Sequence, residues 1–157
     1  MKIKIGISEV KLQKCVDLLS VVLADEMALY IKTRKFHWNV TGESFMELHK
    51  LFERQYTELE KVIDEVAERI NKLGSKTIGT MKEFSSLTRI EEHPNKYPTQ
   101  KNMLAELLAD HELLTLELRK DIAICADEIE DAGTADMLTK MIQQHESEAW
   151  ILRRYLE

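Results

Sequence analysis

Four long stretches of the chain carry apolar residues at every third or fourth position, and this period limits the fold more than any other feature. The first stretch runs from Glu9 to about Trp38, and the others span roughly 44–73, 100–130 and 134–157. Each matches the period of an amphipathic helix. The 157 residues include only five Gly and two Pro, whereas a β-sandwich or barrel needs turn residues about every 8–12 positions. The sequence therefore predicts an all-α protein.

The connections between the stretches predict how the helices are arranged. Residues 39–42 and 131–133 are short links that favour antiparallel hairpins, whereas residues 75–99 form a link of 25 residues. A link of that length can cross a bundle and has room for a short helix around residues 81–90. We therefore expect a ferritin-like four-helix bundle with one long crossover that carries a short helix.

Local signals mark where two of these helices begin. Ser44 followed by Glu47 has the form of a capping box, and Thr134 stands where it can cap the last helix. The length of the chain is also typical of one compact domain with a single core. We therefore expect residues 1–157 to form a single ferritin-like domain.

Composition excludes several classes of function. The formal net charge is −6, which disfavours a general nucleic-acid-binding surface and suits a protein that handles cations. The sequence contains no run of about 20 apolar residues, so we expect no membrane span. The start of the chain lacks the features of a targeting segment. Cys15 and Cys125 form no Cys-x-x-Cys pair and are predicted to be reduced thiols. These features together predict a cytoplasmic protein.

The second stretch carries a group of possible metal ligands beside its apolar stripe. His49 and Glu53 stand four residues apart, as do Asp64 and Glu68. Because an α-helix advances 100° per residue, all four side chains fall within about 100° of one another. Imidazole and carboxylate groups together suit iron, manganese or zinc. The alternative is that these are polar residues on a solvated helix face, which is the commoner fate of charged side chains.

A single copy of this helix cannot bring both pairs to one metal, because residues 49 and 68 are separated by about 28 Å along a helix. The midpoint of positions 49 and 68 is 58.5, and positions 53 and 64 share it. A two-fold axis at that point would place His49 and Glu53 of one chain beside Glu68 and Asp64 of a second. The spacing therefore predicts two equivalent metal sites shared between subunits.

A longer pattern of residues includes these positions. It comprises KFHWNVTGESF at 35–45, LHxLxE at 48–53 and DxxAER at 64–69. This pattern closely resembles the signature of the Dps family, the mini-ferritins named as DNA-binding proteins from starved cells. The resemblance extends over essentially the whole chain, including its length and its long crossover.

The resemblance implies a hollow homododecamer built from two-fold dimers, with ferroxidase centres at the two-fold interfaces. The implied ligands are His37, His49 and Glu53 of one subunit with Asp64 and Glu68 of the other, although the family often has Asp in place of Glu53. Proteins of this kind bind Fe(II), oxidise it preferentially with hydrogen peroxide and more slowly with dioxygen, and store the ferric oxide in the cavity. Iron is thus the expected metal.

Other residues have weaker functional interpretations. Trp38 follows His37 directly and either donates oxidising equivalents or simply packs. Related mini-ferritins use acidic residues at a three-fold axis as an iron entry pore, and by that resemblance Asp127, Asp131 and Asp136 are the pore candidates. The plainer interpretation of Asp136 is a carboxylate in the first turn of a helix, where it suits the helix dipole.

Three alternatives to the shared site can be compared with the sequence. An intrachain di-iron centre needs a Glu-x-x-His motif, and no Glu stands three residues before any of the five histidines. A DNA-associated stress-protection protein would need a basic extension, but only Lys2 and Lys4 precede the first helix. In a metal-free structural bundle, His37, His49 and Asp64 would be replaceable without loss.

Overall fold

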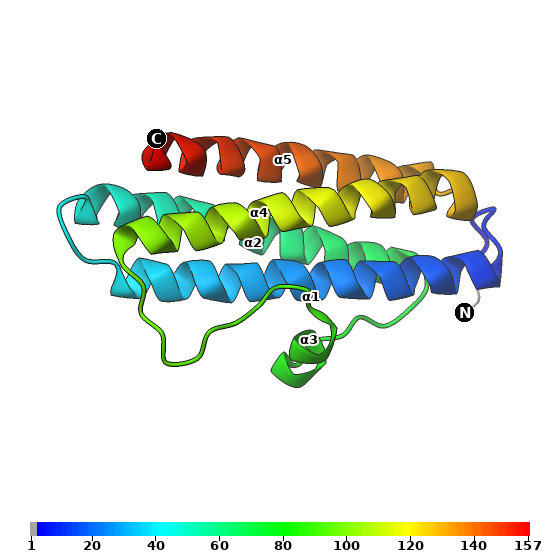
Figure 1. The fold of residues 1–157 in the computed structure, drawn as a ribbon. Helices are drawn as coiled ribbons and strands as arrows, with labels where there is room; N and C mark the ends of the chain where they lie inside the picture. Colours follow the sequence, from blue (N-terminus) through cyan, green and yellow to red (C-terminus); the bar gives the residue numbers. More distant parts are fainter. Residues whose placement is uncertain (1–2) are drawn as a thin grey trace.

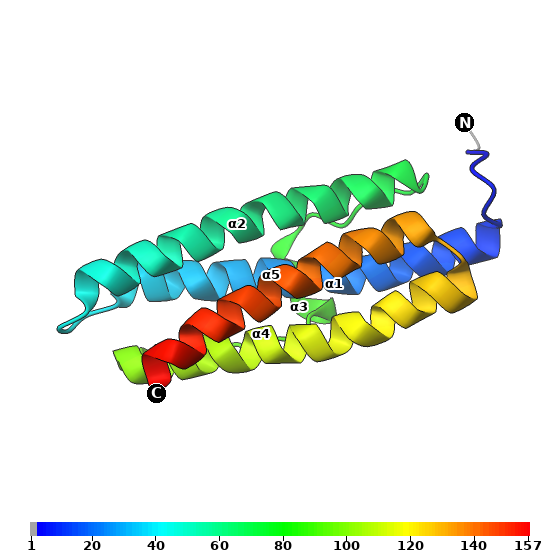
Figure 2. The same ribbon diagram turned by 90° about the horizontal axis from the view of Figure 1, so that it is seen from above.

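The computed structural model describes residues 3–157 and contains four long helices that run side by side (Figures 1 and 2). They are α1 (Glu9–Asn39), α2 (Phe45–Lys72), α4 (Gln100–Ala123) and α5 (Ala132–Leu156). Lys2, one of the two lysines considered for DNA binding, lies outside the described residues. The long crossover carries the short helix α3 (Met81–Leu87). The predicted all-α, ferritin-like bundle with a crossover helix is confirmed.

The four long helices form two hairpins, α1 with α2 and α4 with α5. The crossover between the hairpins runs along the outer side of α1, where α3 also packs (Figure 1). None of the helices in the described chain combines the length and hydrophobicity that a bilayer crossing requires.

A buried carboxylate on α1 anchors the crossover. Asp25 is 1% exposed and accepts hydrogen bonds from the backbone N–H of Arg89 at 2.6 Å and from the Thr88 hydroxyl at 3.0 Å. The Arg89 guanidinium donates to the second Asp25 oxygen at 2.7 Å and also pairs with Glu117 and Asp121 on α4. Charge-assisted bonds of this kind tie the crossover to both hairpins.

The core consists of two buried apolar clusters, one toward each end of the bundle. One includes Leu19, Leu23, Val66 and Leu138, and the other includes Leu29, Phe36, Phe52, Leu107 and Leu152. Near their junction lies a group of buried polar side chains, and we call this group the polar layer. Its members come from all four long helices and are Glu26, Gln55, His111, His145 and Glu148.

The helix ends differ from the local predictions in three places. Ser44 occupies the N-cap position of α2 but makes no capping hydrogen bond, because its backbone (φ −92°, ψ 25°) is not in the extended conformation that aims a cap side chain at the first turn. Asp131, not Thr134, caps α5. The predicted third helix does not continue to residue 130 as α-helix: a six-residue π-helix, η1 (Ile124–Ile129), follows α4 and ends at Glu130 in the left-handed region.

Candidate metal centre

His37 near the end of α1 and His49 in the first turns of α2 meet across the α1–α2 turn. Their imidazole rings are stacked, with centroids 3.8 Å apart and planes inclined by 23°. Each ring bonds the backbone of the other residue: His37 Nδ1 lies 2.8 Å from the carbonyl oxygen of His49, and His49 Nδ1 lies 3.0 Å from the carbonyl oxygen of His37. The two contacts are reciprocal and tie the helix ends together.

These contacts decide which nitrogen of each ring can bind a metal. A carbonyl oxygen only accepts hydrogen bonds, so each Nδ1 must carry the proton and donate it. In the neutral ring, Nε2 then keeps its lone pair. Metal-binding histidines typically have this arrangement, with one ring N–H donated to a backbone carbonyl and the other nitrogen free for the metal. The two rings therefore offer two oriented nitrogen ligands side by side.

Aromatic residues hold the two rings in place. Tyr56 contacts the His37 ring edge-on at 5.3 Å, and Phe45 lies against the His49 ring at 5.1 Å. His37 is 8% exposed and His49 is half-buried. The rings are thus supported from within the chain, which reduces the entropy lost when a ligand binds.

The three acidic candidates on α2 are all exposed, and they do not join the histidine pair within one chain. Glu53 follows His49 by about one turn. Asp64 lines an open groove of 570 Å³ between α1 and α2, together with Met27 and Tyr30. Glu68 accepts a hydrogen bond from Lys72 at 2.9 Å, and this contact lowers its pKa. Across residues 3–157, no three His, Cys, Asp or Glu side chains surround a common point.

Trp38 and two tyrosines surround a residue that the sequence analysis missed. Arg34 lies over the rings of Tyr30, Trp38 and Tyr56, with its guanidinium carbon 5.4, 5.4 and 4.6 Å from their centroids. Trp38 is 64% exposed, so its indole is not a buried packing residue. The spacing of Tyr30, Arg34 and Trp38 at every fourth position could have revealed three of the four members, because such residues share one helix face.

Comparison with known proteins places this chain in a family. A model of the ferritin-like domain matches residues 16–157. DNA protection during starvation protein 2 (Dps) of Bacillus anthracis is 36% identical over 144 residues, which cover 92% of this chain and 97% of that protein. The chain belongs to the Dps family of ferritin-like proteins. An uncharacterized low-temperature-induced protein of Nostoc is 41% identical over 156 residues, covering 99% of this chain and 87% of that protein.

Solved structures of Dps proteins have the same fold as this chain. DpsC from Streptomyces coelicolor superposes with a TM-score of 0.95 at 28% identity, covering 100% of this chain and 91% of that one. Dps from Thermosynechococcus elongatus superposes with a TM-score of 0.87 at 32% identity, covering 92% and 91%. The agreement extends over the long helices and the crossover of this Dps-family chain.

The predicted pore residues of this Dps-family chain have different environments. Asp127 is exposed on η1, and Asp136 is exposed on α5. Asp136 lies beyond the first turn of α5 and pairs with Lys140 at 3.0 Å, so its predicted place in that first turn is wrong. Asp131 is 5% exposed.

The Asp131 carboxylate is already occupied. It caps α5 by accepting from the Thr134 N–H at 3.2 Å, and it accepts from Arg69 Nη2 at 2.8 Å and the Thr134 hydroxyl at 2.6 Å. Burial opposes ionisation of Asp131, but the hydrogen bonds from Thr134 and Arg69 outweigh it, and its pKa is lowered. Its position fits a structural cap.

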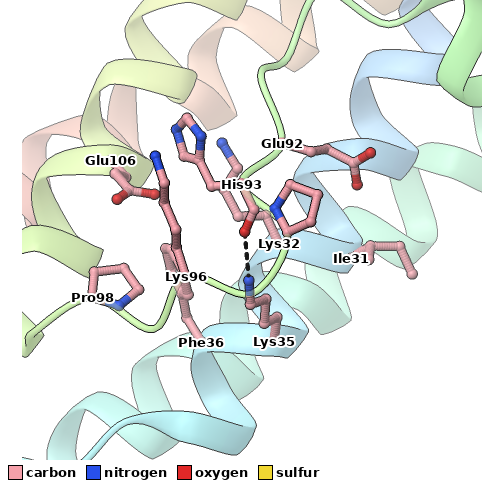
Figure 3. A pocket seen from close by; sticks show the side chains of 10 residues that line it. Ile31, Lys32, Lys35, Phe36, Glu92, His93, Lys96, Pro98 and Glu106 are labelled. Carbon is pink, nitrogen blue, oxygen red and sulfur yellow. Dashed lines mark hydrogen bonds between the residues drawn. The ribbon is translucent and has the colours of Figure 1, made fainter.

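A separate pocket of 280 Å³ lies between α1 and the crossover, and its lining includes none of the predicted metal residues (Figure 3). Lys35 donates from one side to the backbone carbonyl of His93 at 3.0 Å, shown as the dashed line in Figure 3. Lys32 in its wall pairs with the buried Asp110 at 2.6 Å. The pocket therefore has mixed charge and lies apart from the candidate metal centre.

Proposed function

We propose that this chain is an iron-storage and detoxification mini-ferritin that oxidises Fe(II) at centres shared between two subunits. The observation that carries the proposal is the reciprocal bonding of His37 and His49, because it fixes two imidazoles with both Nε2 atoms free. Membership of the Dps family supports the proposal, as does the name of a structural relative. The Dps protein of Vibrio cholerae, which superposes with a TM-score of 0.89 at 28% identity, is described as belonging to a superfamily of ferritin-like diiron-carboxylate proteins.

The carboxylates complete the proposed centre from a second subunit. Glu53 lies one turn beyond His49 and joins the pair from the same chain. Asp64 and Glu68 of a second chain would approach across a two-fold axis at position 58.5 of α2. Their exposure supports this, because residues that must reach a neighbouring subunit have to lie on the surface of the single chain. The resemblance to Dps extends the pairing to a dodecamer.

The proposed reaction uses iron and peroxide as substrates. Two Fe(II) ions each lose one electron to hydrogen peroxide, which takes up two protons and leaves as two water molecules. The imidazoles and carboxylates bind Fe(II), and the hard carboxylate oxygens favour the Fe(III) product. Trp38, which follows His37 directly, quenches oxidising equivalents in this proposal by donating an electron to them. The ferric product is then stored as an oxide, and dioxygen acts as a slower oxidant.

Iron entry and cellular location follow the same proposal. Exposed Asp127 and Asp136 are the pore residues that we favour, since rings of carboxylates concentrate cations. Asp131 is a poorer candidate because Arg69 and Thr134 already hold its oxygens. Cys15 and Cys125 are both free thiols, which agrees with a reducing cytoplasmic location.

Stopped-flow absorbance of ferric formation tests the ferroxidase proposal. Peroxide is added to anaerobic protein loaded with Fe(II), alongside Asp64→Ala and an iron-only control. We expect rapid oxidation by the wild type and a rate near the control for Asp64→Ala. Mixing Asp64→Ala with His49→Ala should restore activity, because each mixed dimer then has one intact shared centre. Failure to recover activity after verified subunit exchange would contradict the shared site.

A second candidate function is DNA-associated stress protection with little ferroxidase activity. The name of the Bacillus anthracis relative, DNA protection during starvation protein 2, favours it, and the net charge of −6 opposes it. A gel shift at low salt tests this function. A shift that disappears in the variant with both Lys2→Ala and Lys4→Ala would support DNA binding through the N-terminal lysines. The absence of a shift would leave the storage function alone.

A further inference from the structure

The polar layer in the bundle core contains a chain of hydrogen bonds that the proposed iron chemistry does not use. Glu26 on α1, His111 on α4 and His145 on α5 are each no more than 2% exposed. Glu26 Oε1 lies 2.8 Å from His145 Nε2, and His145 Nδ1 lies 2.9 Å from His111 Nδ1. Three helices from both hairpins are therefore connected through two imidazole rings.

The contact between the two Nδ1 atoms permits only one proton between them. A hydrogen bond at 2.9 Å needs one nitrogen that carries hydrogen and one that has a lone pair. If both nitrogens carried hydrogen, the two N–H groups would point at each other and the bond would be lost. The geometry is therefore incompatible with two imidazolium rings.

An extra proton has no other favourable place on this pair. His111 Nε2 is buried and has no hydrogen-bond partner within residues 3–157. A proton placed there would create a buried positive charge with an unsatisfied N–H, which costs free energy in an apolar interior. A proton placed on the second Nδ1 would break the contact between the rings.

The surrounding charged groups do not offset a charge on His111. On α2, Arg54 pairs with Glu148 of α5 at 2.6 Å, so that carboxylate is already neutralised, and Gln55 donates to it at 2.9 Å. On α1 and α4, Lys32 and Asp110 pair with each other. Glu26 is the remaining carboxylate of the layer, and it faces His145. Burial, followed by the charges of His145 and Arg54, holds the pKa of His111 well below its usual range.

We propose that the Glu26–His145–His111 chain is an acid-sensitive lock in the bundle core. The lock holds α1, α4 and α5 together while the two imidazoles share one Nδ1 proton, and it opens when both Nδ1 atoms are protonated. In the unfolded chain His111 takes up a proton below about pH 6.5, whereas the folded core resists it. Stability is therefore present above that pH and is lost as the pH falls.

Urea unfolding of His111→Gln and the wild type between pH 6.5 and pH 5 tests the lock. Gln can donate to or accept from His145 Nδ1 but cannot titrate. One depressed histidine should make the unfolding equilibrium constant of the wild type rise about 16-fold more than that of His111→Gln over this range. His93→Gln is the matched control, because His93 lies outside the layer on the crossover, and it should follow the wild type. Equal pH dependence in His111→Gln and the wild type would overturn the proposal.

Hydrogen exchange of the wild type gives a second measurement that needs no variant. After correction for intrinsic exchange rates, amides near residues 108–114 and 142–148 should lose protection between pH 7 and pH 5. Amides near residues 60–70 of α2 serve as the internal control and should change less. A uniform change along all the helices would contradict a lock in this layer.

Discussion

The molecule contains two histidine pairs, and their different surroundings suit them to different tasks. His37 and His49 stack near the surface, and each donates its Nδ1 proton to a backbone carbonyl. His111 and His145 lie in the core, where their Nδ1 atoms bond each other and His145 Nε2 bonds Glu26. The first pair leaves both Nε2 atoms free for a ligand. In the second pair, three of the four ring nitrogens form hydrogen bonds with other side chains of the protein.

The comparison shows that the partner of each ring nitrogen, rather than the presence of histidine, decides what a pair can do. We call His37 and His49 the outer pair, and His111 and His145 the inner pair. A backbone carbonyl accepts a hydrogen bond at any pH, so it fixes the tautomer of the outer pair. In the inner pair the partner of each Nδ1 is another imidazole nitrogen, which can donate or accept. The contact between the two Nδ1 atoms therefore depends on how many protons they carry. The following experiments test this difference between the outer pair and the inner pair, from the largest expected effect to the smallest.

Truncation of the inner pair should mainly reduce stability. His145→Ala removes the hydrogen-bond partner of buried Glu26 and should lower the free energy of unfolding by about 3–5 kcal/mol. Urea unfolding at pH 7 measures this loss. His145→Gln keeps an N–H donor for Glu26 and should lose much less. An Ala variant as stable as the Gln variant would show that the Glu26 contact contributes little.

Truncation of the outer pair should mainly reduce activity. His49→Ala removes a proposed iron ligand and should slow peroxide-driven ferric formation by about 100-fold or more. Loss of a residue that only orients a metal ligand typically lowers activity by about 10- to 100-fold, and loss of a ligand itself should reach at least the upper end of that range. Stopped-flow absorbance measures the rate. His93→Ala is the matched control and should keep the wild-type rate. An unchanged rate in His49→Ala would remove the functional distinction between the two pairs.

Chemical modification should separate the two pairs in the intact wild type. Diethyl pyrocarbonate reacts with unprotonated imidazole nitrogen, so half-buried His49 should be modified at least about tenfold faster than His111, which opens only through local unfolding. Mass spectrometry of peptides measures both rates. Anaerobic Fe(II) should protect His49 and leave the His111 rate unchanged. Equal rates for the two residues would mean that the core layer is open to solvent.

The aromatic support of the outer pair should have the smallest effect. Tyr56→Leu removes the edge contact with His37, and such contacts contribute about 0.5–1.5 kcal/mol. The rate of iron oxidation should therefore fall only about two- to tenfold, as measured by the same stopped-flow assay. Tyr97→Leu on the crossover is a control that should leave the rate unchanged. A loss as large as that of His49→Ala would give Tyr56 a direct role.

Much of the fold could be predicted because helical periodicity is a local property. The four long helices, the short helix near residue 81 and the crossover follow from apolar spacing and from the placement of Gly and Pro. The predicted caps were less reliable. Asp131 and Thr134 both stand near the start of α5. Asp131 is the cap, and it also accepts a hydrogen bond from Arg69 on α2. Such a contact between distant helices has no local signal.

The candidate site was only partly accessible from sequence. His49 could be singled out by its type and its spacing from Glu53, whereas His37 is implied only by the resemblance to the Dps family. Their assignment as iron ligands stays a prediction. Their reciprocal bonds to backbone carbonyls depend on how the α1–α2 turn closes. The structure buries His111 and His145 in the core. Their mutual bond could not be predicted, because it joins residues 34 positions apart.

The sequence by itself determined the helices, their connections and the residue types available for metal chemistry. The tertiary structure decided which histidine nitrogens remain free, which carboxylates are exposed and which are already bonded. The physical reason is the distance along the chain over which each effect acts. Apolar periodicity acts within a few turns of one helix, whereas the partner of a ring nitrogen depends on how separate helices are rotated against one another when the core packs.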